Sequence, residues 1–199
     1  MLGDDLASII RSGWDLLEQG ASNRRSMMHT PVVASIDQHG LPDQRVMVLR
    51  EADRDRRLLR FHTDIRSPKV DQIGDGAPVH ILAYEADARV QLRMSGLGRV
   101  VSDGPEADAA WAESSLFARR CYLAEQGPGS QSGVPTSGLP TQVEGRKPSE
   151  DQVAPGRTNF AVLMVRIDCM DWFSLAQAGH RRALVEWEGG VPHGRWLVP

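Results

Sequence analysis

Lysine is almost missing from this chain of 199 residues. The sequence has 21 arginines but only two lysines, Lys69 and Lys147, and we interpret the imbalance as an effect of GC-rich coding. The formal net charge of −3 excludes a general positive field that would attract nucleic acid or an anionic membrane. Composition therefore explains the arginines, whereas the two lysines stand out.

Cysteine is also scarce, and long apolar runs are absent. Cys121 and Cys169 stand alone, without a CxxC pair or a metal-ligand spacing, which favours free thiols over a disulfide. No apolar run reaches the roughly 18 residues that a membrane-spanning helix needs. The opening MLGDDLASII has acidic residues where a signal peptide has basic ones, so we expect a cytoplasmic protein.

The short motifs of the common enzyme classes are missing as well. The sequence has no GxSxG, GxxxxGK[ST] or HExxH, and no GxGxxG after a predicted strand. His29, His39 and His193 lie in polar or turn segments typical of solvated histidines. We therefore assign no catalytic residue and no metal site from motifs, and the length predicts one domain over residues 1–199.

Two helices and a series of short β-branched segments are predicted. Residues 4–19 form an amphipathic pattern that Asp4 or Asp5 can cap and Gly20 can end. A second helix is predicted from Pro105 to about Glu125. The predicted strands cover residues 32–37, 45–50, 58–63, 78–84, 89–103, 159–168, 171–176 and 181–187, with a QHGLPD turn between the first two.

The spacing of these strands predicts the fold class. It indicates a mainly β (α+β) protein, an antiparallel barrel with peripheral helices. Gly96 and Gly98 lie inside the strand at 89–103 and predict a β-bulge or a tight bend. Residues 127–156 contain 15 Gly, Pro or Ser among 30, which predicts a long loop or a mobile lid, with a disordered insertion as the alternative.

A possible anion site begins at the predicted cap of a short helix. Ser67 is at the N-cap position, Pro68 follows, and Lys69 stands in the first turn. A cation there opposes the helix dipole unless an anion such as phosphate is bound nearby. The alternative is an ordinary exposed lysine.

Two further segments could contact a ligand. Arg45 and Arg50 bracket the apolar run VMVL, where they could hold the phosphate of a cofactor whose ring lies on the sheet, or could be ordinary strand-end arginines. The segment DWFSLAQAGHRRA places an aromatic ring and cationic groups across a hairpin, which could line a ligand mouth; for Trp172, core packing is the alternative. The remaining members of that group are His180, Arg181 and Arg182.

These segments, in their order, resemble the pyridoxamine 5′-phosphate oxidase family of FMN-binding split barrels. The resemblance covers residues 25–103 and 157–199 and rests on RVMVLR, FHTDIRSPK, VQLRMSG and the closing WLVP. It looks nearest to an uncharacterised branch with the pattern GRxNFAV…DWxxL…GHRRA. The resemblance implies an antiparallel split barrel, bound FMN and a homodimer with FMN at the subunit interface.

The resemblance also implies the residues of the site. It places Arg45 and Lys69 on the FMN phosphate, His180 against the substrate, and Trp172 and Arg182 in the site of the partner subunit. Arg50 and Gln91 would stabilise the reduced flavin. The implied FMN-binding residues are Arg45, Val46, Met47, Val48, Arg50, His62, Thr63, Ser67, Lys69, Gln91, Trp172 and Arg182.

Departures from the family pattern bear on the substrate. Pro68 replaces an arginine of the phosphate site, which Arg66 could offset, and Ala178 replaces an arginine that holds the vitamin substrate. We therefore expect an FMN-binding flavoprotein that oxidises or reduces a small molecule, with a different or unknown substrate. The alternatives are a non-catalytic protein that binds flavin, haem or deazaflavin on the same barrel, or an interaction protein without a cofactor.

Overall fold

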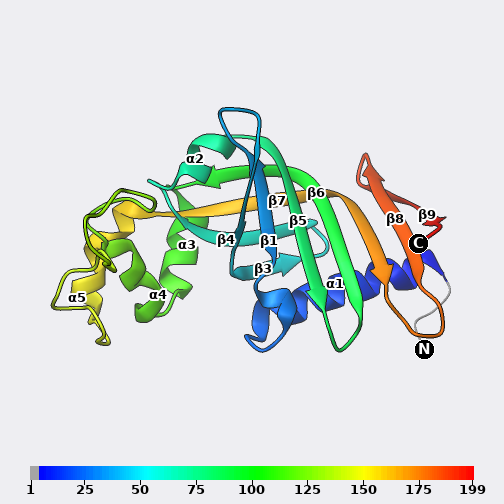
Figure 1. Ribbon diagram of the computed structural model, residues 1–199, viewed down its shortest axis with the longest axis horizontal. Helices are drawn as coiled ribbons and strands as arrows, with labels where there is room; N and C mark the ends of the chain where they lie inside the picture. Colours follow the sequence, from blue (N-terminus) through cyan, green and yellow to red (C-terminus); the bar gives the residue numbers. More distant parts are fainter. Residues whose placement is uncertain (1–4) are drawn as a thin grey trace.

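A computed structural model describes residues 5–199 and contains one antiparallel sheet of nine strands (Figure 1). The strands follow the order β2-β1-β5-β6-β7-β4-β3, and β8 pairs with β7 and with β9. Their bounds are β1 Val32–Ile36, β2 Pro42–Val46, β3 Leu49–Asp53, β4 Leu58–Asp64, β5 Ala77–Glu85, β6 Val90–Val101, β7 Phe160–Ser174, β8 Arg181–Glu188 and β9 Val191–Leu197. The sheet does not close, and it confirms a mainly β fold with peripheral helices.

Helices cover the ends and one face of this sheet. The helices are α1 Leu6–Ser22, α2 Pro68–Ile73, α3 Pro105–Glu113, α4 Leu116–Arg120 and α5 Glu150–Val153, with 3₁₀ turns η1 Met27–His29, η2 Cys121–Leu123 and η3 Ala154–Asn159. Figure 1 shows α3, α4 and α5 at one end of β7 and the β8–β9 hairpin at the other. No helix within residues 5–199 is long and apolar enough to cross a membrane.

Strand β7 corrects the prediction of two strands at 159–168 and 171–176. It is one strand of 15 residues, and it pairs with β4 through its first half and with β8 through its second half. Strand β6 runs along its other side, with a register shift between Ser95 and Gly96. The shift leaves Asp168, where the first predicted strand ends, as the extra residue on β7, and the chain stays extended through it to Ser174.

Helix α1 packs its apolar face against the sheet and continues past the predicted end. The Asp5 carboxylate caps it by accepting a hydrogen bond of 2.8 Å from the Ser8 amide, and the alternative cap, Asp4, lies outside the described residues. Gly20 does not end the helix. A Cβ there would approach the Met28 Cβ to 2.6 Å, so this glycine allows η1 to pack closely on α1.

The predicted strand 45–50 is divided in the structure. Strand β2 ends at Val46 and pairs with β1, whereas β3 begins at Leu49 and pairs with β4 at the opposite edge of the sheet. Because the two halves join different neighbours, the chain must turn between them. The turn between β1 and β2 is also shorter than QHGLPD, because β2 already begins at Pro42.

The region after β6 differs from the prediction both in the helix predicted to end near Glu125 and in the segment 127–156. The helix predicted to run to about Glu125 breaks into α3, α4 and η2 because Ser115 caps a new helix, with its hydroxyl accepting from the Ala118 amide at 3.3 Å. The segment 127–156 is largely irregular as predicted, but a capping box between Ser149 and Gln152 starts α5 within it.

The predicted bulge at Gly96 is confirmed, and its glycine is required by a close backbone contact. A Cβ on Gly96 would lie 1.9 Å from the Arg166 carbonyl oxygen on β7. We expect Gly96→Ala to lower the free energy of unfolding by at least about 2 kcal/mol, because backbone must move to admit the methyl group. Urea denaturation measures the change. Gly76→Ala is the control, since its Cβ would meet nothing closer than 3.9 Å; equal losses in the two variants would contradict the prediction.

Candidate functional site

A cavity of about 720 Å³ opens where the β2–β3 link, the end of β4 and the start of α2 meet. The segment 121–138 forms its remaining wall. The cavity brings together nine of the twelve residues that the resemblance implied for FMN binding. These are Arg45, Val46, Met47, Val48, Arg50, His62, Thr63, Ser67 and Lys69.

One end of the cavity holds a cation without a counter-ion. The Lys69 ammonium donates hydrogen bonds to the Ser67 hydroxyl at 2.5 Å and to the Thr63 hydroxyl at 3.4 Å. Within residues 5–199 no carboxylate lies within ion-pair distance of it. Burial, with a further contribution from Arg45, lowers the pKa of Lys69. A half-buried ammonium whose partners are two neutral hydroxyls is suited to receive an anion.

The local fold explains why these hydroxyls are available. Ser67 is the N-cap residue of α2, but its side chain makes no capping hydrogen bond. Pro68 occupies the first turn of the helix, as predicted. Ser67 and Thr63 are each 4% exposed, so their positions are set by packing and both face Lys69.

Arg45 at the same end already has an anionic partner. Its guanidinium forms an ion pair of 2.6 Å with Asp43 and donates to the Ser35 hydroxyl at 2.7 Å and to the Gln72 side-chain oxygen at 3.1 Å. A hydrogen bond from Gln72 is the main cause that lowers the pKa of Asp43, and Arg45 and Lys69 add to it. Of the two predicted phosphate ligands, Lys69 is therefore the uncompensated one.

The cavity lining also includes a guanidinium and a neutral imidazole. Arg50 Nε and His62 Nε2 are both buried without a hydrogen-bond partner. The Ser114 hydroxyl donates to the Ala110 carbonyl at 2.7 Å, so it accepts from His62 Nδ1 at 3.4 Å and leaves Nε2 with a lone pair. Burial, with help from Arg50 and Arg60, lowers the pKa of His62 to about 3.

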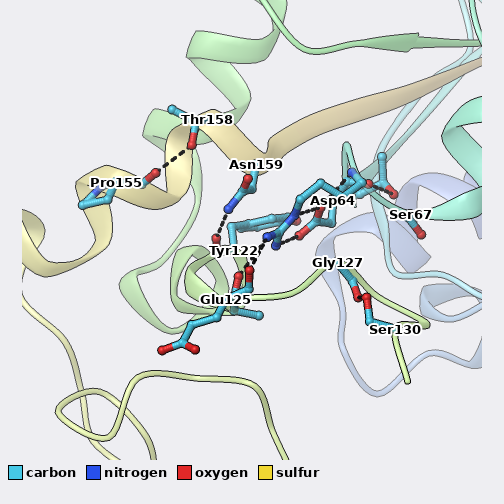
Figure 2. Close-up of polar contacts among 12 residues, drawn as sticks. Asp64, Ser67, Tyr122, Glu125, Gly127, Ser130, Pro155, Thr158 and Asn159 are labelled. Atoms are coloured by element: carbon cyan, nitrogen blue, oxygen red, sulfur yellow. Dashed lines mark hydrogen bonds and ion pairs between the residues drawn. The ribbon is translucent and has the colours of Figure 1, made fainter. Parts of the chain in front are cut away.

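The segment 124–138 lies against the cavity, which sequence reasoning left open. Arg66 holds its start by donating to the Ala124 carbonyl at 2.9 Å while its guanidinium pairs with Asp64 at 2.7 Å. Figure 2 shows Asp64 together with Glu125 and Gly127 of this segment. Arg66 therefore anchors this wall and does not replace the charge missing at Pro68. Sequence reasoning missed Asp64, Cys121, Tyr122 and the residues of this segment as lining groups.

Four implied residues lie outside the cavity. Strand pairing aligns Gln91 with Phe173 and Phe173 with Arg182, so these side chains share the outer face of the sheet. Arg182 forms an ion pair of 2.6 Å with Asp171 there. His180 contacts the ring of Phe173 edge-on at 5.6 Å.

Trp172 points to the opposite face of the sheet. It is 1% exposed and belongs to the main core, and its indole nitrogen has no hydrogen-bond partner. Core packing, the alternative named from the sequence, describes its place in this chain.

Comparisons with known proteins show what the first half of this chain is similar to. Residues 12–102 match the family model described as "Pyridoxamine 5'-phosphate oxidase, FMN-binding domain". A pyridoxine/pyridoxamine 5′-phosphate oxidase from Maricaulis maris is 30% identical over 105 residues, which are 53% of this chain and 46% of that protein. The chain thus matches about half the length of this curated relative.

Solved structures agree in fold. A pyridoxamine 5′-phosphate oxidase-related, FMN-binding protein from Nostoc punctiforme superimposes with a TM-score of 0.74 at 24% identity, over 95% of this chain and 96% of that one. PhzG from Burkholderia lata superimposes with a TM-score of 0.68 at 15% identity, over 99% and 94%. The fold is thus that of the FMN-binding split barrels. Residues 12–102 are thus similar to the FMN-binding domain of the pyridoxamine 5′-phosphate oxidase family, in agreement with the resemblance seen in the sequence.

The buried imidazole of His62 gives the protein a pH dependence. The unfolded chain binds a proton on this residue near pH 6.5, whereas the folded chain holds it neutral down to about pH 3. The free energy of unfolding therefore decreases as the pH falls below about 6.5, and this group contributes at most about 1.4 kcal/mol per pH unit. We expect His62→Gln, which cannot titrate, to lose less stability than the wild type between about pH 6.5 and about pH 4 in urea denaturation. Identical slopes in the two proteins would count against a buried neutral histidine.

Proposed function

We propose that this protein binds FMN in the described cavity and uses it to oxidise or reduce a small molecule. The observation that carries the proposal is the Lys69 ammonium, a half-buried cation at one end of a cavity of about 720 Å³ with only hydroxyl partners. A cavity of this size is within the range of small-molecule and cofactor sites, roughly 300–1,000 Å³. The match to an FMN-binding family domain supports the assignment.

The residues present fit the parts of FMN. Lys69, Ser67 and Thr63 offer one ammonium and two hydroxyls to a phosphate. The link Val46–Val48 offers apolar surface to a flat ring, and Arg50 adds a guanidinium that has no ion-pair partner within residues 5–199. Bound flavin would supply hydride or electron transfer, while the protein positions it and tunes its electronics.

The substrate we propose differs from that of the oxidases that give the family its name. Ala178 stands where the resembling oxidases have a substrate arginine, and the segment 124–138 lines the cavity with small and hydroxyl-bearing residues. The retained flavin residues together with the altered substrate residues support flavin chemistry on another small molecule.

We further propose a homodimer whose contact surface is the outer face of the sheet. Val46 and Leu82 flank Val32 in one row of this face and are 63% and 44% exposed. Gln91 and Arg182 lie on the same face, so such a dimer would bring them toward the partner subunit. Exposed apolar groups of this kind favour association of two copies.

Spectroscopy and titration test the cofactor. The purified protein is expected to show flavin absorbance, or to regain it with added FMN; a Soret band, or no rescue by flavin, would overturn the proposal. Lys69→Ala is expected to weaken FMN binding by about 1.5 kcal/mol or more, roughly ten-fold in Kd, because it removes the uncompensated cation. Lys147→Ala is the matched control, since it removes the other lysine, which is exposed and outside the cavity lining.

A separate measurement tests whether the bound flavin transfers electrons. Flavin bound to the wild type is reduced anaerobically, and its reoxidation by oxygen and by candidate acceptors is followed. Turnover with an acceptor supports an oxidoreductase, whereas bound flavin that exchanges no electrons with any acceptor favours a carrier.

The dimer prediction concerns Leu82. We expect Leu82→Glu to shift the protein toward monomer in size-exclusion chromatography with light scattering, because a charge would enter the apolar contact. FMN affinity should fall in parallel if the site is shared between subunits. Val134→Glu serves as control because Val134 is 68% exposed on the irregular segment and away from the sheet face. A wild-type protein that is monomeric at all concentrations would refute the dimer.

A further inference from the structure

A carboxylate forms an ion pair with Arg45, one of the cations that line the cavity. Asp43 on β2 contacts the Arg45 guanidinium at 2.6 Å and accepts a hydrogen bond from the Gln72 side-chain amide at 2.8 Å. Gln72 belongs to α2, the same helix that carries Lys69. The network therefore connects the helix of one cation to the strand of the other.

The orientation of every group in this network follows from its partners. The Ser35 hydroxyl donates to the Gln72 side-chain oxygen at 2.5 Å, and Arg45 donates to the same oxygen at 3.1 Å. The amide nitrogen of Gln72 consequently faces Asp43. Ser35 is 2% exposed, so its end of the network lies against the core, whereas the Asp43 side chain at the other end is 43% exposed.

Asp43 is not needed to aim Arg45. The guanidinium keeps three other acceptors: the Ser35 hydroxyl at 2.7 Å, the Gln72 oxygen at 3.1 Å and the Val33 carbonyl at 3.4 Å. What Asp43 supplies in addition is a negative charge. With Arg45 and Lys69 positive and Asp43 negative, this end of the cavity carries one net positive charge instead of two.

We propose that Asp43 is a specificity-determining residue that limits how strongly this site binds a phosphate group. It holds the charge of Arg45 in an ion pair within the chain, so the site recognises phosphate mainly through Lys69. The inference rests on the proposed function, since it concerns the same FMN site. Its consequence is a ligand that is held through a modest phosphate contribution rather than through two free cations.

The physical basis is charge repulsion between Asp43 and a phosphate bound near Lys69. A phosphate monoester carries about −1.5 to −2 charges at neutral pH, and a nearby carboxylate opposes it. Two unit charges about 7 Å apart at an effective dielectric constant of about 40 to 80 interact by roughly 0.6 to 1.2 kcal/mol, which is about three- to eight-fold in affinity for each unit of phosphate charge. Removing the carboxylate should recover a factor of this size.

Asp43→Asn tests the proposal, because it removes the charge and keeps the shape. Affinities for FMN and for riboflavin are measured by flavin fluorescence on the full-length protein. The two ligands differ only in the phosphate, so their ratio isolates the phosphate contribution. We expect the preference for FMN over riboflavin to rise about five-fold in Asp43→Asn, with riboflavin affinity unchanged.

A matched control separates local from general charge effects. Asp75→Asn removes one exposed carboxylate just after α2, and it should leave the ratio unchanged. The FMN affinity of Asp43→Asn should also fall more steeply with added salt than that of the wild type, since the uncovered charge of Arg45 then faces the phosphate.

The outcomes distinguish the inference from the function on which it rests. An unchanged or smaller preference for FMN in Asp43→Asn, with riboflavin affinity retained, overturns the role of Asp43. A wild type that binds neither FMN nor riboflavin overturns the proposed function instead. If Asp43→Asn lowers riboflavin affinity through a folding defect, Asp43→Ser, which is also neutral, is measured in the same way and its ratio decides.

Discussion

Strand β7 forms ladders with three other strands, and the position of the cavity depends on them. Its first half pairs with β4, whose end carries His62 and Thr63, and its second half pairs with β8. Strand β6 runs along both halves, which is possible because Gly96 lets its backbone approach the Arg166 carbonyl. One long strand thus supports the cavity at one end and the C-terminal hairpin at the other (Figure 1).

This division along β7 explains why the implied site residues fall into two groups. The implied residues between β2 and α2 line the cavity. Gln91 and Arg182 lie instead on the outer face of the sheet, next to the half of β7 that pairs with β8. Alternation along the strand then separates neighbours in sequence. Asp171 and Phe173 share the outer face, and Trp172 between them enters the core. A family motif read as a continuous run of residues does not show which of its side chains point to the outer face and which enter the core.

Several features were predictable because their causes are local. The cap at Asp5 and the proline that starts α2 each follow from one residue and its immediate neighbours. The division of residues 45–50 was not predictable in the same way, because it depends on which distant strand each half joins. Gly20 shows the same limit, since a glycine that ends a helix and one that admits Met28 look alike in sequence.

The position of residues 124–138 in the cavity wall was not predictable either, because it also depends on residues distant in sequence. Composition correctly indicated that most of residues 127–156 lack regular structure, but nothing local told where they lie. Their place is set by Arg66, which reaches the Ala124 carbonyl across 58 positions of sequence and is itself paired with Asp64. Sequence reasoning had considered Arg66 as a spare cation for a phosphate, and the structure uses its charge for the wall.

Because Arg45 and Arg66 near the cavity are held in ion pairs, the lysine in the cavity lining becomes the important cation. Around the cavity Arg45 is matched by Asp43 and Arg66 by Asp64, so these guanidinium charges are compensated and their fixed donors are used to hold strands and loops together. Lys69 has hydroxyl partners only, and an ammonium on a flexible stem can turn toward an incoming anion. In a chain with 21 arginines and a net charge of −3, the number of cationic residues therefore says little about binding. What matters at this site is which cation is left without a carboxylate, and at the end of the cavity formed by α2 that cation is Lys69.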